Sequence, residues 1–145
     1  MKKKNVFHII GCGVVGTFLS FQLAYCHIAE EIHLYDYDTI SIKDSDIYPG
    51  LKNKKVIDCP KVNIVKNTID NLRIHNLHTI AHFGRFPDIL DMIIMNNDDI
   101  YIDCRDHKQL DFDFDFRVSL DGNLLLIDTF ERSKIEFNSV VDMGY

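Results

Sequence analysis

Short runs of apolar residues alternate along this chain with segments whose apolar residues recur at helical spacing. The runs predict β-strands, and the segments between them predict the α-helices that connect those strands. Strand and helix alternate in this way in a mainly parallel sheet, because neighbouring parallel strands need a long crossover. We therefore expect strands at 6–10, 32–35, 77–83, 100–104, 124–127 and 135–141, with helices at 14–29, 60–72 and 87–95.

Two stretches depart from this alternation. Residues 39–55 form a long polar connection that contains the turn signal Pro49-Gly50. Residues 111–116 alternate strictly between Asp and Phe, which predicts a strand or an extended edge with one face in water. The whole pattern predicts an α/β fold with a three-layer, Rossmann-like, doubly wound and mainly parallel sheet, whose C-terminal strands can run antiparallel.

The composition narrows the class of protein. A chain of 145 residues with 46% apolar residues is large enough for one self-standing core, so we expect a single domain spanning residues 1–145. The net charge of −6 argues against a broad nucleic-acid-binding surface, and no apolar run approaches the length of a membrane span. Four scattered cysteines without a Cys-x-x-Cys pair argue against a zinc ribbon and favour reduced thiols in a cytoplasmic protein.

The most informative motif follows the first predicted strand, where Gly11, Gly13 and Gly16 form a Gly-x-Gly-x-x-Gly pattern that leads into a helix. Gly11 allows a tight turn, and Gly13 lets the backbone come close to phosphates that a Cβ would meet. Gly16 lets the helix pack close to the strand. The helix then presents its unpaired N–H groups and the positive end of its dipole to an anion. The pattern predicts a nucleotide-binding loop.

Asp36 ends the second predicted strand, about twenty residues after the glycine loop. A carboxylate there can accept hydrogen bonds from ribose hydroxyl groups, although it could instead cap a turn. If the ligand were a nicotinamide dinucleotide, Asp36 would favour NAD over NADP by repelling a 2′-phosphate. No residue set for hydride chemistry accompanies it in this chain.

Three further charged positions follow Asp36 in order. They are Asp38, then Lys61 beside Pro60 at the start of a helix, and then Asp106 just after the fourth predicted strand. An enzyme that activates a carboxylate with ATP needs such a set: an acid for ribose, a lysine for the α-phosphate, and a carboxylate for Mg²⁺ at the end of a central strand. Lys61 and Asp106 are therefore the candidate catalytic residues, and Asp106 is the candidate metal ligand.

The ordered set resembles the ubiquitin-activating enzyme superfamily, and in particular its bacterial ThiF/MoeB-like members. The resemblance implies an enzyme that uses ATP and Mg²⁺ to adenylate the C-terminal glycine of a ubiquitin-like or sulfur-carrier protein, or a reduced relative of such an enzyme. It implies that Asp36 holds ribose, Lys61 holds phosphate and Asp106 holds magnesium. The resemblance covers residues 5–108, and its motifs are the glycine loop, the Asp36-x-Asp38 pair, the Pro60-Lys61 pair and the segment from Asp103 to Asp106.

The chain departs from that family in the loop after Asp38. The family carries an asparagine and an arginine there, both of which contact phosphate, whereas this chain has Asp44 and Ile47. An acid repels a triphosphate unless a metal intervenes, and isoleucine cannot stabilise the departing pyrophosphate. Arg105, or an arginine from the second subunit of a homodimer, could replace the missing charge. Residues 109–145 match no part of the family, and its catalytic-cysteine segment and paired zinc cysteines have no counterpart in this sequence.

Two alternative functions stay open. One is a non-catalytic Rossmann module that binds a nucleotide, or none, and acts through a protein interface. The other is an NAD-binding oxidoreductase. Several further groups have structural interpretations: Cys12 packs under the glycine loop, His78 and His82 share one strand face without a third metal ligand, and the acidic row at 111–115 is a solvated strand face.

Overall fold

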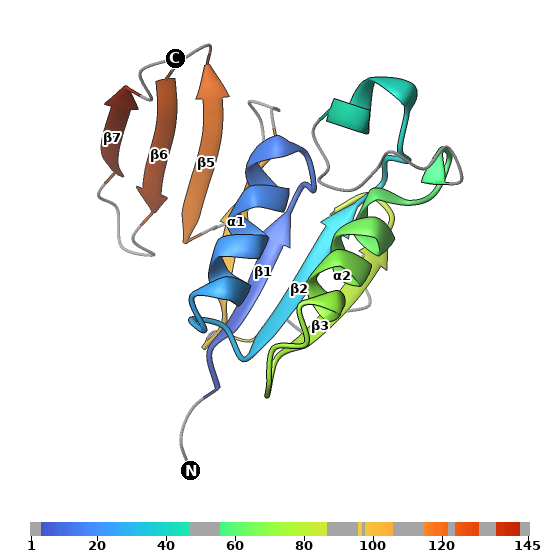
Figure 1. The fold of residues 1–145 in the computed structure, drawn as a ribbon. Coiled ribbons are helices and arrows are strands. Elements are labelled where there is room, and N and C mark those ends of the chain that lie inside the picture. Colours follow the sequence, from blue (N-terminus) through green and yellow to red (C-terminus); the bar gives the residue numbers. More distant parts are fainter. Residues whose placement is uncertain are drawn as a thin grey trace.

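The computed structural model describes residues 4–46, 56–86, 96, 98–105, 115–121, 124–130 and 136–142. These residues form a sheet of seven strands in the order β3-β2-β1-β4-β5-β6-β7 (Figure 1). The strands are β1 (Val6–Ile10), β2 (Glu31–Asp36), β3 (His78–Phe83), β4 (Ile100–Asp103), β5 (Phe116–Asp121), β6 (Leu124–Phe130) and β7 (Glu136–Asp142).

The sheet confirms the expected α/β fold. Strands β3, β2, β1, β4 and β5 are parallel, whereas β6 and β7 pair antiparallel. The chain runs outward from β1 to β3 and then returns to β4 on the other side of β1, which is the doubly wound order. The six predicted strands are present with their ends shifted by a few residues. Phe116, the last residue of the Asp-Phe segment, is the first residue of β5, and residues 111–114 lie outside the described residues.

Two α-helices, α1 (Val14–Tyr25) and α2 (Lys61–Asn71), cover one face of the sheet (Figure 1). The third predicted helix, 87–95, lies outside the described residues. The core fills the space between these helices and the strands, because alternate strand residues and one stripe of each helix turn toward each other. Its buried members include Phe7, Ile9, Ile32 and Leu34 from the strands, and Leu23, Val62, Val65 and Ile69 from the helices.

Helix α1 ends at Tyr25 and is therefore shorter than the predicted helix at 14–29. His27 takes a left-handed conformation with φ 54°. Its N–H donates to the Ala24 carbonyl at 3.0 Å, and the Ile28 N–H donates to the Leu23 carbonyl at 3.0 Å. This pair of bonds closes the last turn as in a Schellman motif, so the apolar residues that follow lead toward β2 instead of extending the helix.

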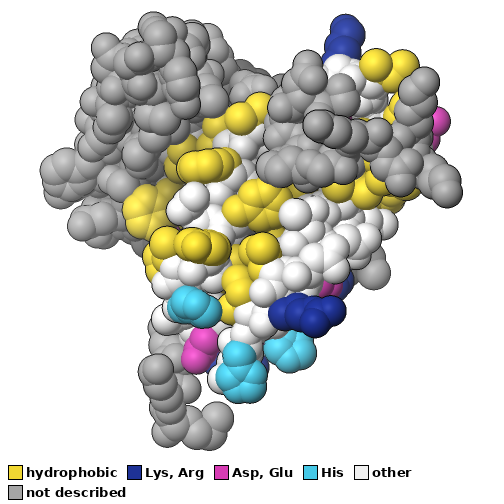
Figure 2. All heavy atoms as spheres, in the orientation of Figure 1, with side chains coloured by type: hydrophobic (Ala, Val, Ile, Leu, Met, Phe, Trp, Pro, Cys, Tyr) yellow, Lys and Arg dark blue, Asp and Glu magenta, His cyan; other side chains and the backbone are white. Residues whose placement is uncertain are grey.

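The outer side of α1 carries an apolar stripe. Val14, Phe18 and Tyr25 are all exposed, and their spacing of four and seven residues places them on one side of the helix. Figure 2 shows hydrophobic side chains gathered over this part of the molecule. Neither helix in the described ranges has the length and apolar character needed to cross a membrane.

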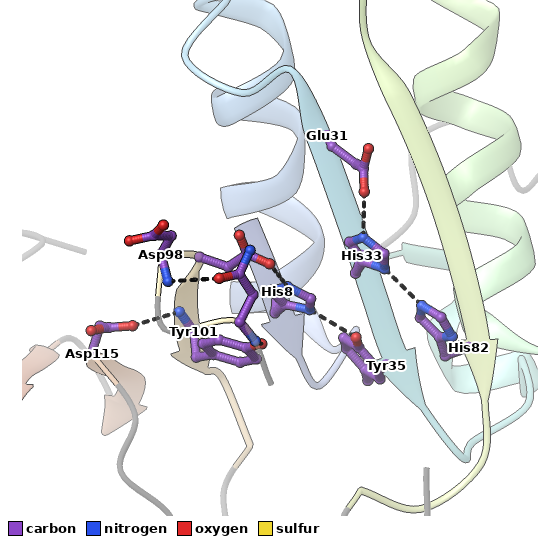
Figure 3. A network of polar contacts seen from close by, with 10 residues as sticks. His8, Glu31, His33, Tyr35, His82, Asp98, Tyr101 and Asp115 are labelled. Atoms are coloured by element: carbon purple, nitrogen blue, oxygen red, sulfur yellow. Dashed lines mark hydrogen bonds and ion pairs between the residues drawn. The ribbon is translucent and has the colours of Figure 1, made fainter. Parts of the chain in front are cut away.

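The opposite face of the sheet carries a stack of five aromatic rings from four adjacent strands (Figure 3). The centroid separation is 4.2 Å between His8 and Tyr101, 4.5 Å between His8 and His33, and 4.5 Å between Tyr35 and His82. Two series of side-chain hydrogen bonds run through the stack. One joins Asp99, His8 and Tyr35, and the other joins Glu31, His33 and His82.

The stack explains where the histidines of β3 lie. His82 joins the ring stack, whereas His78 on the same strand is exposed. Within the described ranges, no group of three or more His, Cys, Asp or Glu side chains could hold a metal ion. Burial is the main cause that lowers the pKa of His8, so this ring stays neutral and packs in the stack.

We expect the stack to make the stability of the fold sensitive to acid. Burial, followed by electrostatic interactions with the neighbouring rings of His33 and His8, lowers the pKa of His82 to about 4 from an ordinary 6.5. Between these values the unfolded chain binds a proton that the folded chain does not. The contribution of His82 to stability is therefore present above pH 6.5 and is lost as the pH falls toward 4. We expect a loss of about 1–2 kcal/mol, because solvent screens this half-buried ring.

Urea unfolding at pH 7 and pH 5 measures this loss. His82→Phe is the matched control, because it keeps an aromatic ring in the stack and removes the titrating group. The variant should lose less stability than the parent protein between the two pH values. Equal losses in the two proteins would show that the acid sensitivity has another source.

Candidate functional site

A cleft of about 570 Å³ opens at the carboxyl ends of the parallel strands. It lies where the strand order reverses between β1 and β4, the edge at which open α/β sheets bind their ligands. Its walls come from segments that follow four strands and from the first residue of α2. The lining segments are 10–13 after β1, 35–38 at the end of β2, 84–86 after β3 and 104–105 after β4, together with Lys61.

The three glycines of the loop meet different physical demands. Gly11 has φ +96°, which an L side chain rarely adopts, and its N–H donates to the Tyr35 carbonyl at 2.8 Å. A Cβ on Gly16 would lie 1.8 Å from the Gly11 carbonyl oxygen, so only glycine lets α1 approach the loop this closely. A Cβ on Gly13 would meet nothing within 4 Å. Gly13 therefore faces the open cleft, and no side chain caps the helix that begins after it.

Asp36 connects the end of β2 to the glycine loop. Its Oδ2 accepts the Cys12 N–H at 2.6 Å, and its Oδ1 accepts the Asp38 N–H at 2.8 Å. Burial raises the pKa of Asp36 above its ordinary value, because the desolvation of the carboxylate outweighs these two backbone hydrogen bonds. Asp36 also lines the cleft, so the structure holds this carboxylate beside the loop where sequence spacing predicts a ribose contact.

Lys61, the first residue of α2, turns its side chain back toward two carboxylates. Its Nζ lies 3.5 Å from Asp38 Oδ2 and 3.6 Å from Asp44 Oδ1. Asp44 belongs to the short 3-10 helix η1 (Ile42–Asp46) in the connection after β2. The structure thus brings the predicted residues Asp36, Asp38 and Lys61 to one wall of the cleft, and it adds Asp44 behind Lys61.

A buried carboxylate organises the opposite wall. Asp103, whose side chain is 0% exposed, pairs with Arg105 Nε at 2.9 Å and with Arg117 Nη2 at 3.3 Å. Arg105 also donates through Nη1 to the Phe86 carbonyl at 3.1 Å, and its guanidinium lies 5.4 Å from the Phe86 ring centroid. These contacts hold Arg105 in the cleft lining, beside Gly11.

Asp106 and Ile47 lie outside the described residues, so their predicted roles stay predictions. Asp103 is not a suitable metal ligand, because each of its carboxylate oxygens is paired with an arginine. Among the two acids of the Asp103–Asp106 segment, Asp106 therefore remains the candidate ligand for Mg²⁺.

Tyr37 and Arg85 also line the cleft, although no motif in the sequence points to them. The Arg85 guanidinium lies 5.1 Å from the centroid of the Tyr37 ring, and both side chains are exposed. They follow β2 and β3, whose carboxyl ends lie at the same sheet edge. The positions of these strand ends were the signal that could have identified them.

The cysteines near the cleft are not activated thiols. Burial raises the pKa of Cys12 well above its ordinary value and raises the pKa of Cys104 to about 12. Both side chains belong to the hydrophobic core, as expected for Cys12 under the glycine loop. None of the four cysteines of the chain is in a disulfide.

Comparison with known proteins places this fold among solved structures. No protein-family model and no curated protein sequence matches the chain. E. coli MccB has a similar structure, with a TM-score of 0.68 and 17% sequence identity over 91% of this chain and 39% of MccB. E. coli MccB bound to AMPCPP and MccA gives a TM-score of 0.67 at 16% identity, over 91% of this chain and 42% of that chain. PaaA gives a TM-score of 0.58 at 19% identity, over 86% of this chain and 40% of PaaA.

These similarities establish the fold alone, a Rossmann-like α/β fold that the chain shares with MccB and PaaA. The chain spans about two fifths of the length of these solved chains. MccB is a microcin C7 biosynthetic enzyme, and its solved structures include complexes with ATP and with MccA.

Proposed function

We propose that the cleft binds ATP and that this chain is a ThiF/MoeB-like adenylyltransferase. One observation supports the proposal: Gly13 faces an open cleft while Asp36 is hydrogen-bonded to the same loop, so the positions proposed for phosphate and ribose are adjacent. MccB, which shares the fold, has been solved with ATP and with the ATP analogue AMPCPP, and these complexes support the same class of ligand here.

The proposed reaction joins a carboxylate to AMP. A C-terminal carboxylate oxygen of a ubiquitin-like or sulfur-carrier protein attacks the α-phosphorus of ATP, and the bond from that phosphorus to the bridging oxygen breaks. The products are an acyl adenylate and pyrophosphate, which keeps the electron pair of the broken bond. The complexes of MccB with MccA support a polypeptide as the second substrate.

The residues of this chain would act by position and charge. Backbone N–H groups at the start of α1 would bind phosphate oxygens, and Asp36 would hold the ribose. Lys61 and Arg105 would stabilise the charge that develops on the phosphates. Mg²⁺, held by Asp106, would supply further charge neutralisation. A homodimer also belongs to this proposal, and the apolar stripe of Val14, Phe18 and Tyr25 offers a surface for it.

Pyrophosphate exchange tests the catalytic part of the proposal. We expect exchange of label between pyrophosphate and ATP only when a carrier protein with a C-terminal glycine is present. Asp106→Ala should abolish it, because the metal loses its ligand. Asp70→Ala, which removes an exposed acid of α2, should leave it unchanged. Exchange that survives in Asp106→Ala would exclude this mechanism.

One observation favours a non-catalytic binding module as the second candidate. The ammonium of Lys61 is already paired with two carboxylates, which reduces its ability to act on a phosphate. Calorimetry separates the two functions: a folded sample without detectable binding of millimolar ATP·Mg²⁺ would favour the module. Tighter binding of NADH than of ATP would instead favour the NAD-binding oxidoreductase.

A further inference from the structure

The ammonium of Lys61 is enclosed by protein groups. Its side chain is only 14% exposed, and Nζ lies between Asp38 Oδ2 at 3.5 Å and Asp44 Oδ1 at 3.6 Å. The backbone reinforces the arrangement, because the Lys61 N–H donates to the Asp38 carbonyl at 3.0 Å. One positive and two negative charges thus meet at the start of α2.

Asp44 is the better fixed of the two acids. Its Oδ2 accepts the Ser41 N–H at 2.7 Å and the Ser41 hydroxyl at 2.9 Å, which leaves Oδ1 directed at Lys61. Its side chain is 13% exposed, compared with 51% for Asp38. Burial alone would raise the pKa of Asp44, but the Ser41 hydrogen bonds and the Lys61 charge outweigh it and lower the pKa. Asp44 is therefore an anion at neutral pH.

The two acids occupy different places relative to the cleft. Asp38 and Lys61 line it, whereas Asp44 is absent from its lining and contacts Lys61 from behind. Asp44 can therefore act on a ligand through Lys61, by holding an ammonium that a phosphate would otherwise attract. A ligand phosphate that reaches Lys61 must compete with a carboxylate that Ser41 holds in place.

A divalent cation would change this competition. Bound to a polyphosphate, it reduces the negative charge that the ligand brings to the acids. The cation can also bind the exposed Asp38 carboxylate, since Mg²⁺ prefers oxygen donors and commonly binds carboxylates together with phosphates.

We infer that Asp44 determines the charge selectivity of the cleft: it holds Lys61 so that a nucleoside triphosphate binds well only as its complex with a divalent cation. This inference rests on the proposed binding of ATP and deepens it. Asp44 is in this account a positioning residue, and the contact with the ligand is made by Lys61.

Calorimetric titrations with ATP and adenosine, each in excess Mg²⁺ or in EDTA, test the inference. The parent protein should bind ATP at least tenfold more weakly in EDTA than in Mg²⁺. Asp44→Asn should raise the affinity for ATP in EDTA about tenfold, because Lys61 is released to the phosphates. Its affinity for adenosine, which has no phosphate, should change less than twofold.

Two controls separate the action of Asp44 from other effects. Asp70→Asn makes the same change of charge nine positions beyond Lys61 on α2, where Asp70 pairs with Lys66. This variant should leave the affinities for ATP and for adenosine unchanged, both in Mg²⁺ and in EDTA. In a Lys61→Met background, Asp44→Asn should no longer raise the affinity for ATP in EDTA tenfold, because the ammonium that it releases is missing.

A chain that folds but binds neither ATP·Mg²⁺ nor adenosine would overturn the proposed function and this inference with it. If ATP·Mg²⁺ binds but Asp44→Asn leaves the dependence on Mg²⁺ unchanged, the inference alone is wrong.

Discussion

Replacing Gly16 with alanine is expected to destabilise the fold by about 3 kcal/mol or more. The new Cβ would lie 1.8 Å from the Gly11 carbonyl oxygen and 3.3 Å from the Cys104 Cβ. The closer atom belongs to the backbone, so a side-chain rotation cannot relieve the overlap. Helix α1 would have to move away from β1, and the buried contacts of Leu23 would loosen. Urea unfolding followed by circular dichroism measures the change in the free energy of unfolding.

Gly13→Ala is the matched control for this substitution. Gly13 has φ −73°, which any residue adopts, and its Cβ would meet no atom within 4 Å. We expect a change in stability of at most about 0.5 kcal/mol. If phosphates bind against this backbone, the same variant should lose at least tenfold in affinity for ATP·Mg²⁺. A Gly16→Ala protein as stable as Gly13→Ala would show that α1 does not pack as described.

The second large effect is expected at Asp103. Its carboxylate is fully buried between Arg105 and Arg117, so Asp103→Asn would remove a buried negative charge that two largely buried guanidinium groups share. The expected cost is about 3–5 kcal/mol of folding free energy. The cleft should also lose order, because Asp103 holds Arg105 against Phe86.

Asp70→Asn provides the comparison for a surface pair. Asp70 and Lys66 form an exposed i,i+4 ion pair on α2. Removing its charge should cost about 0.3–0.5 kcal/mol. Equal and small costs at both positions would contradict the account of the Asp103 cluster, because a buried anion would then contribute no more than an exposed one.

The sequence predicted the parts of this molecule that depend on local pattern. The alternation of apolar runs was sufficient to predict every described strand except β5, which begins at Phe116, where the expected Asp-Phe strand ends. The doubly wound order follows from the connection rules once the strands are known. The three glycines and Asp36 were recognisable as candidates because a phosphate-binding loop would need them at fixed spacing. The end of α1 was predicted too late, since the left-handed conformation of His27 leaves no trace in the apolar pattern.

The rest depended on pairs of residues that are distant along the chain. Asp44 reaches Lys61 across 17 positions, and Asp103 reaches Arg117 across 14, through contacts that no local spacing encodes. The ring stack joins four strands in the same way, because it depends on the register of neighbouring strands. The sequence therefore predicted Asp36, Asp38 and Lys61 at the cleft, but it missed Arg85 and did not indicate which charges neutralise each other.

A crystal structure of the protein with ATP and Mg²⁺ tests the central claim most directly. The account predicts a nucleotide in the cleft between the ends of β1 and β4, with phosphate oxygens within hydrogen-bond distance of the backbone N–H groups at Gly13 and Val14. The ribose hydroxyl groups should lie within hydrogen-bond distance of the Asp36 carboxylate. A nucleotide bound elsewhere, or one whose ribose lies away from Asp36, would contradict the account.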